Sequence, residues 1–135
     1  MAELLRFELV SPEKSLRSSD VFMVVVPGSE GDFGVMLGHA PLVSTIRPGA
    51  IHIYPTSMSD VPERIFVAGG FAEVGTTGLT ILAESATVAS EIDVEGVARE
   101  LVEARELLRA AHGEAEINIA ERIAKLEAMQ AVVVN

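Results

Sequence analysis

The sequence has 135 residues, no cysteine and a formal net charge of −10. Its length fits one domain with a small appendage, and a 49% share of hydrophobic residues argues against disorder. The negative charge argues against nucleic acid or anionic lipid as a partner, and the lack of cysteine excludes disulfides, thiolate metal sites and a cysteine nucleophile.

The beginning of the chain shows no targeting signal. The first ten residues carry charges at Glu3, Arg6 and Glu8, which is not typical of a signal peptide. No run in the sequence approaches the roughly 20 apolar residues that cross a bilayer. We therefore expect a soluble protein without direct membrane insertion.

Short strands are predicted through the first part of the chain, where all six prolines and nine of the eleven glycines lie. Apolar residues at 5, 7 and 9 alternate with charged ones, which is the period of a half-buried strand. Further strands are expected at residues 20–26, 50–54, 63–68, 71–74 and 79–83. Since no helical stretch divides them, residues 1–88 are predicted to form an antiparallel β-sandwich or barrel.

The segment GDFGVMLGHAPLVSTIRPG, residues 31–49, has the glycine content of a functional loop. A phosphate-binding loop would need a Gly-Lys-Ser/Thr sequence, but this segment has no lysine. A dinucleotide-binding turn would need a helix after it, and strand-like residues follow instead. The glycines are therefore interpreted as turn positions, and no cofactor is predicted.

Three histidines are the candidate metal ligands or bases. His39, His52 and His112 show no ligand spacing, and zinc would need three or four ligands. Ser44 and Ser85 lack the context of a nucleophile. We interpret His39 as a hydrogen-bonded turn residue and predict no catalytic residue and no metal. The alternative is an independent ligand- or metal-binding β-sandwich that uses His39 or His52.

Residues 89–135 are predicted to form an antiparallel hairpin of two helices. Ser90 to Asp93 resemble a capping box at the start of the first helix, and Gly113 is placed to end it. One stripe of the first helix carries Val94, Val97, Leu101, Ala104, Leu108 and Ala111. The second helix carries Ile119, Ile123, Leu126 and Met129 on one side.

The hairpin stripe has two interpretations. It can simply pack on the partner helix or on the sandwich. Alternatively it can change partners, because two of its six positions are alanine and a two-helix hairpin buries each side chain only partly. In that case Gly113 would act as the hinge, and a helix of another subunit would compete for Val94, Val97, Leu101 and Leu108.

Six sequence elements carry a resemblance to a known family. They are FELVSP at 7–12, PGSEGDFG at 27–34, GHAPL at 38–42, RPG at 47–49, FVAGGF at 66–71 and LTILAE at 79–84. With a helical hairpin after them, the chain resembles the epsilon subunit of bacterial F-type ATP synthases. The resemblance implies a non-catalytic rotor subunit at the cytoplasmic face of the inner (plasma) membrane, attached through the complex.

The resemblance also implies partners. In that family the sandwich binds the gamma subunit of the central stalk and rests on the ring of c subunits, coupling proton flow to ATP synthesis. The family's glycine turn faces the ring, which assigns Asp32 and, close by, Glu30 and His39 to that contact. The family's hairpin lies folded on the sandwich or extends along gamma toward the alpha and beta subunits and blocks ATP hydrolysis.

Some members of that family bind ATP at the hairpin through the motif Ile/Leu-Asp-x-x-Arg-Ala. Here Ile92 and Asp93 match, but Gly96 stands at the arginine and Val97 at the alanine. The missing cation removes the best phosphate partner, so Asp93 is interpreted as a remnant of the nucleotide motif and no bound nucleotide is expected.

A third hypothesis is a pure adaptor whose hairpin only pads the sandwich. Deletion of residues 91–135 distinguishes this adaptor from a regulatory subunit.

Overall fold

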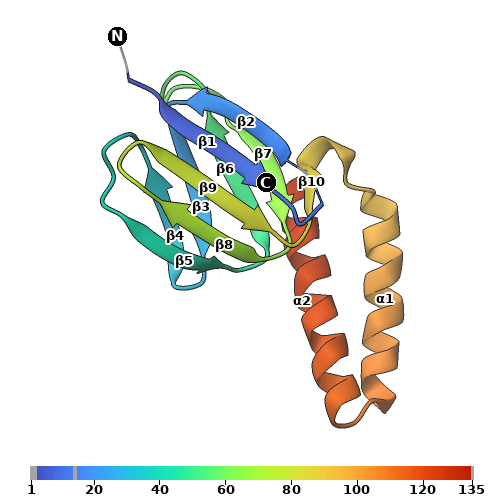
Figure 1. Cartoon of the computed structure of the whole chain (residues 1–135). Coiled ribbons are helices and arrows are strands. Elements are labelled where there is room, and N and C mark those ends of the chain that lie inside the picture. The colour runs from blue at the N-terminus through green and yellow to red at the C-terminus, as the bar shows by residue number, and fades with distance from the viewer. Residues whose placement is uncertain (1–2, 14, 135) are drawn as a thin grey trace.

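The computed structural model describes residues 3–13 and 15–134, and within them strands come first and helices last (Figure 1). The first five strands are β1 (Leu5–Val10), β2 (Ser15–Val21), β3 (Met23–Gly28), β4 (Gly31–Val35) and β5 (Leu42–Ile46). The next five are β6 (Gly49–Tyr54), β7 (Glu63–Val67), β8 (Gly70–Val74), β9 (Gly78–Ala83) and β10 (Ala86–Val88). A short 3₁₀ helix, η1 (Ala89–Glu91), leads into α1 (Val94–Ala110) and α2 (Glu114–Val134).

The strands form one sheet that folds into two facing layers. Its order is β10-β7-β6-β3-β5-β8-β9-β1-β2, with β4 paired to β3 at the side. The predicted β-sandwich with a C-terminal two-helix hairpin is therefore confirmed. One pair departs from the antiparallel pattern, because β1 runs parallel to β9, with Phe7 opposite Leu79. The two strands lie far apart in the sequence, so no tight turn forces them to be antiparallel.

The alternation read from the sequence builds the core between the layers. Leu5, Phe7 and Leu9 on β1 are at most 1% exposed. Ile51 and Ile53 face them from the other layer and are fully buried. Each such side chain contributes roughly 1.5–3 kcal/mol of gross burial energy. The result is a stiff body in which every strand is joined to a neighbour.

The single strand expected at residues 20–26 is wrong in its bounds. The chain breaks at Phe22, whose backbone N–H donates to the carbonyl of Tyr54 at 2.9 Å, and β2 and β3 lie on either side of the break. Strand β2 is at the edge of the sheet, so its polar residues face solvent and give no apolar period. Strands β4, β5 and β10 also lie outside the predicted ones.

The helical hairpin forms as predicted, with a different start. Asp93, and not Ser90, is the N-cap of α1, since its Oδ1 accepts the backbone N–H of Gly96 at 3.1 Å. Between the helices Gly113 has a φ of 64°, the left-handed conformation that glycine adopts without strain.

A second cluster of buried residues joins the hairpin to the sandwich. Phe66 of β7 is 1% exposed and packs among Val97 and Leu101 of α1 and Ile123 and Leu126 of α2. Figure 1 shows that α2 lies against the sandwich only through its C-terminal end, while α1 lies on its outer side. The rest of the hairpin projects beyond the strands. Below, the term arm means the whole of residues 89–134, including the docked end of α2.

Candidate functional site

The turn between β3 and β4 forms one tip of the sandwich. Gly28 and Gly31 are opposite each other at the end of this ladder, so Ser29 and Glu30 form the bend. A Cβ on Gly28 would lie 2.7 Å from the Gly31 carbonyl oxygen, and Gly31 has a φ of 133°. Only glycines fit both positions. The turn therefore projects Glu30 into solvent at a fixed place.

Arg47 clamps this turn from the loop between β5 and β6. Its Nη2 lies 2.5 Å from Oδ1 of Asp32, and its Nη1 donates to the Gly28 carbonyl at 2.6 Å. The backbone N–H of Ser29 donates to the Thr45 carbonyl at 3.0 Å, which holds the turn to β5 as well. Both carboxylates of the turn are exposed, but Asp32 is paired with Arg47, and Glu30 lies at the tip.

His39 follows the end of β4 that is far from this turn, and its expected grouping with Glu30 and Asp32 in one contact stays a prediction. The turn is at the start of β4 and His39 comes after its end, and five strand residues span about 17 Å. His39 is half-buried, its Nδ1 is 2.7 Å from the Ala40 carbonyl oxygen, and its backbone N–H donates to the Met36 carbonyl. It is a hydrogen-bonded turn residue, as the sequence predicted.

An apolar strip lies on the outer face of β5, β8 and β9. Its members are Val43, Phe71 and Leu82, which are 69%, 52% and 47% exposed. Phe71 pairs with Leu82 across the two strands, so their side chains share one face. We call this set the apolar strip.

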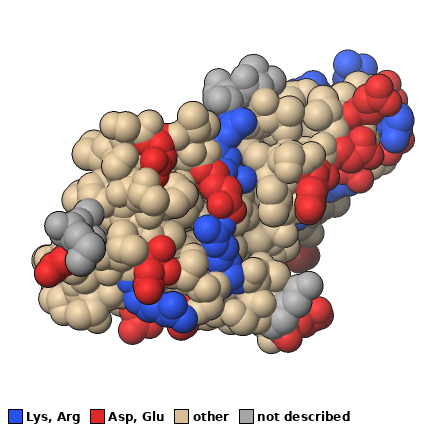
Figure 2. Space-filling model, turned by 90° about the horizontal axis from the view of Figure 1, so that it is seen from above, with Lys and Arg blue, Asp and Glu red and all other residues tan. Residues whose placement is uncertain are grey.

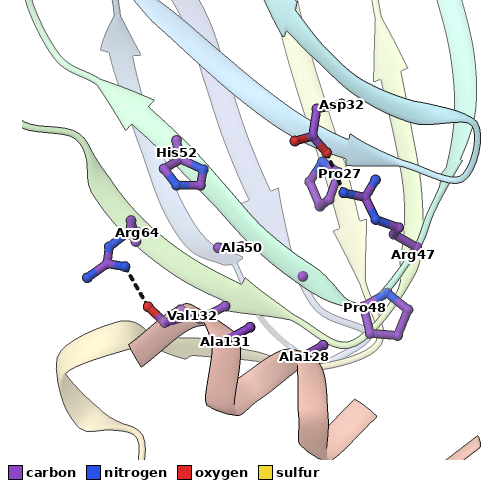
Figure 3. A pocket seen from close by; sticks show the side chains of 11 residues that line it. Pro27, Asp32, Arg47, Pro48, Ala50, His52, Arg64, Ala128, Ala131 and Val132 are labelled. Carbon is purple, nitrogen blue, oxygen red and sulfur yellow. Dashed lines mark hydrogen bonds and ion pairs between the residues drawn. The ribbon is translucent and has the colours of Figure 1, made fainter. Parts of the chain in front are cut away.

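A pocket of about 250 Å³ opens where α2 meets the sandwich (Figure 3). Pro27, Asp32 and Arg47 line one side, and Ala128 and Val132 of α2 line the other. Figure 3 shows Arg64 of β7 reaching the last turn of α2, where its Nη1 donates to the Val132 carbonyl at 2.5 Å. No local sequence pattern predicts this contact, because the two residues are 68 positions apart.

The arm residues singled out from the sequence have different environments. Val97 and Leu101 are buried at 6% and 2% exposure, and Leu108 is half-buried against the same cluster. Val94 is 49% exposed at the first position of α1, so it does not belong to the buried stripe. The stripe begins one turn later, at Val97.

Comparison with known proteins follows the same division of the chain. Residues 4–89 match the family "ATP synthase, Delta/Epsilon chain, beta-sandwich domain". The ATP synthase epsilon chain of Maricaulis maris is 54% identical over 134 residues, with 98% of each chain covered.

This chain belongs to the ATP synthase epsilon chain family.

Solved structures agree with the fold of an epsilon chain. A chain of the Euglena gracilis mitochondrial ATP synthase, in a structure of OSCP, F1 and the c-ring, has a TM-score of 0.86 and 24% identity, with 98% of this chain and 82% of that chain covered. A chain of the Tetrahymena thermophila enzyme, in a structure of the central stalk and c-ring, has a TM-score of 0.67 and 14% identity, with 96% of each covered.

An independent ligand- or metal-binding sandwich is not supported for this chain. Among residues 3–13 and 15–134, no three His, Cys, Asp or Glu side chains come together as metal ligands. His39 is in a turn, His52 is on β6, and His112 is between the helices. The Ser44 hydroxyl donates to the Thr45 carbonyl at 2.9 Å and has no histidine partner among the described contacts.

Asp93 has a structural task in this epsilon chain. Its carboxylate caps α1, and a Cβ at Gly96 would lie 2.4 Å from its Oδ2. An arginine at position 96 would require the Asp93 side chain to move away from the helix.

In the described part of the chain, no helix is both long and apolar enough to span a bilayer.

Proposed function

We propose that this chain is a non-catalytic rotor subunit that couples proton flow to ATP synthesis, clamped between the gamma subunit and the c ring. Membership of the epsilon chain family carries this proposal. The similar mitochondrial chains come from assemblies that hold F1, the central stalk and the c-ring. The corresponding location would be the cytoplasmic face of the inner (plasma) membrane, with attachment through the complex.

The glycine turn is the proposed contact with the c ring. Glu30 stands free at the tip, and Asp32 is fixed by Arg47. A neighbour that pushes on this turn pushes on β3, β4 and β5 together, because the clamp ties their ends to one another. Load at the tip would therefore pass into the sheet with little bending. The resemblance also assigns His39, beyond the other end of β4, to this contact.

The apolar strip is the proposed contact with the gamma subunit. Val43, Phe71 and Leu82 present apolar surface on a face that α1 and α2 leave uncovered (Figure 1). The strip adjoins the glycine turn, because Val43 lines one pocket together with Glu30 and Asp32. The two proposed contacts therefore lie next to each other on one stiff body.

The arm is the proposed regulatory unit, with residues 1–88 as the sandwich domain and 89–135 as the helical domain. We propose that the arm leaves the sandwich and that the hairpin opens at Gly113. The arm then extends along gamma toward the alpha and beta subunits, where it blocks ATP hydrolysis. Figure 2 shows charged side chains along the projecting arm. Residues 91–135 hold ten acidic and five basic residues, so apolar contacts of Val97, Leu101 and Leu108 would carry the binding.

Reconstitution of the complex in proton-tight vesicles tests the coupling role. Proton-driven ATP synthesis should need this chain, and Asp32→Ala should lower synthesis more than it lowers ATP hydrolysis. Asp20→Ala, on an exposed edge strand, is the matched control. Association of the isolated chain with gamma should be weakened by Phe71→Ser. Full synthesis without this chain, or turnover of a substrate by the chain alone, would overturn the proposal.

Deletion of residues 91–135 tests the regulatory role separately. If the arm inhibits, the truncated complex should hydrolyse ATP faster than the full complex and still assemble. Equal rates would favour the pure adaptor, in which the arm only covers Phe66.

A further inference from the structure

We propose that Arg64 is a latch that holds the arm in its docked position by capping the C-terminal end of α2. The proposal concerns the docking of the arm on the sandwich. It rests on the proposed regulatory role only for its consequence in the assembled complex.

The end of α2 has carbonyl groups that the helix itself cannot satisfy. The last four carbonyls of any α-helix lack an intrahelical partner, and the helix dipole concentrates negative charge there. The last turn of α2 contains no basic residue of its own. Arg64 supplies the missing cation from β7, 68 residues away in sequence, through its 2.5 Å hydrogen bond to the Val132 carbonyl.

The strand pattern directs Arg64 to this task. Successive strand residues point to opposite faces, so Glu63 and Arg64 face different neighbours. Glu63 pairs with Arg17 of β2, whereas Arg64 faces α2. No carboxylate within 4 Å competes for Arg64 in the described part of the chain, unlike Arg6, Arg17 and Arg47. Its charge is therefore available to the helix end.

The apolar part of the docking contact is small. Phe66 is the one large buried side chain that the strands contribute to the shared cluster, and Ala50 and Ala68 beside it are only partly buried. Alanine buries little area, so apolar contact alone holds the arm weakly. A directional hydrogen bond at the end of α2 is then a large share of the docking energy. Its loss should raise the ratio of undocked to docked arm about tenfold.

The distance between sandwich and arm measures docking directly. The chain contains no cysteine, so spin labels can be placed on cysteines at Val61 and Ile117, which are 92% and 61% exposed. In the labelled full-length chain, Arg64→Gln should shift the distance distribution toward undocked arms. Arg64→Lys, which keeps a charge and a donor, should recover part of the docked population. An unchanged distribution in Arg64→Gln would overturn the latch.

Arg47→Gln is the matched control for this readout. Arg47 lines the same pocket, but it bonds to Asp32 and the Gly28 carbonyl and not to the helix. Its loss removes the same charge and should leave docking unchanged. An equal shift in both variants would mean that general attraction between the acidic arm and the sandwich holds the arm, which would also overturn the latch.

Amide hydrogen exchange separates a latch from a merely structural role. Arg64→Gln should speed exchange in residues 128–134 of α2 and leave residues 65–67 of β7 protected. Faster exchange in both segments would mean that Arg64 supports the sandwich itself, against the proposal.

ATP hydrolysis by the assembled complex tests the consequence. If Arg64→Gln undocks the arm and the arm inhibits, hydrolysis should fall below that of the parent complex. Undocking without any change in hydrolysis leaves the latch intact and contradicts the regulatory role. Conversely, the latch alone fails if docking is unchanged while deletion of residues 91–135 alters hydrolysis.

Discussion

The sandwich and the arm are stabilised in different ways. Within the described residues, seventeen buried hydrophobic side chains fill the sandwich, and they come from nine strands joined by hydrogen-bonded ladders. The cluster of the arm has eight buried members, of which Phe66 alone comes from a strand. The sandwich is thus held by contacts between distant parts of the sequence, and the arm mostly by contacts between its own two helices.

This difference allows one chain to be stiff and adjustable at once. If the arm left the sandwich, the strands would expose one large side chain that is now buried, Phe66. Exposing it to water would cost roughly 2–3 kcal/mol of free energy. The seventeen-residue core would keep its contacts. The arm can therefore change position without weakening the body that carries torque.

Phe7→Ala should have the largest effect, and it should act on the sandwich. Phe7 is fully buried between the layers, and replacing a buried phenylalanine by alanine costs about 3–5 kcal/mol. Chemical denaturation of the full chain measures the loss. The control is Phe71→Ala, because Phe71 is 52% exposed and should cost far less. Equal losses in the two variants would contradict the layered core described above.

Leu101→Ala should have the next largest effect, and it should act on the arm. Leu101 is 2% exposed, so its truncation should destabilise the arm by about 2–4 kcal/mol and leave the unfolding of the sandwich nearly unchanged. Hydrogen exchange in α1 compared with β1 measures this division. Val102→Ala, at a 57% exposed neighbour, should change neither. A matching loss of protection in β1 would show that the two regions unfold as one.

The sequence predicts those parts of the fold whose signal is local. Alternation placed strands close to β1, β6, β7, β8 and β9, and the three-four spacing placed both helices. Strand β2 was only partly found because Ser15–Val21 is a mostly polar edge strand in which Val21 alone is buried. The glycines of β4 were interpreted as turn positions, and β5 was expected only as strand-like residues without bounds, since small polar residues interrupt it. Their pairing with β3 and β8 supplies the regularity that propensity lacks.

The candidate contacts follow the same rule. The glycines predicted turn positions, and the family resemblance, not their spacing, assigned Asp32 and Glu30 to a contact there. The Arg47 clamp and the Arg64 latch join residues 15 and 68 positions apart, and no local pattern encodes such a pair. The exposure of Val94 was also missed. Its spacing continues the apolar stripe of α1 to the first residue of the helix, but no other element covers the side chain there.

Asp93→Ala sharpens the comparison at the point where sandwich and arm join. Without the carboxylate that accepts the Gly96 N–H, α1 should lose about 1 kcal/mol of stability and fray at its first turn. Hydrogen exchange at residues 94–98 measures the fraying, while the sandwich should be unaffected. Asp93→Asn keeps a capping oxygen and should behave almost as the parent. If Asp93→Asn frayed as much as Asp93→Ala, the negative charge and not the cap would be the stabilising feature.

The smallest expected effect lies in a turn of the sandwich and appears only in acid. The backbone N–H groups of Thr56 and Ser57 donate to Asp60 at 2.6 and 3.0 Å and lower the pKa of its carboxyl below 3.8. Because the pKa is lower in the folded state, the stabilisation is complete above pH 3.8 and is lost as the pH falls through the folded pKa. Asp60→Asn should therefore flatten the acid limb of the stability profile of the sandwich.

Thr56→Val is the control that identifies the donor responsible for this effect. The substitution removes the hydroxyl, which also bonds to Asp60 at 2.9 Å, and keeps the backbone N–H, which is the larger cause of the lowered pKa. It should therefore retain most of the acid dependence. Denaturation midpoints of the three proteins between pH 2 and 6 supply the comparison. An acid limb of equal slope in Asp60→Asn and the parent would assign acid sensitivity to other carboxylates, and a slope lost equally in Thr56→Val would assign it to the hydroxyl.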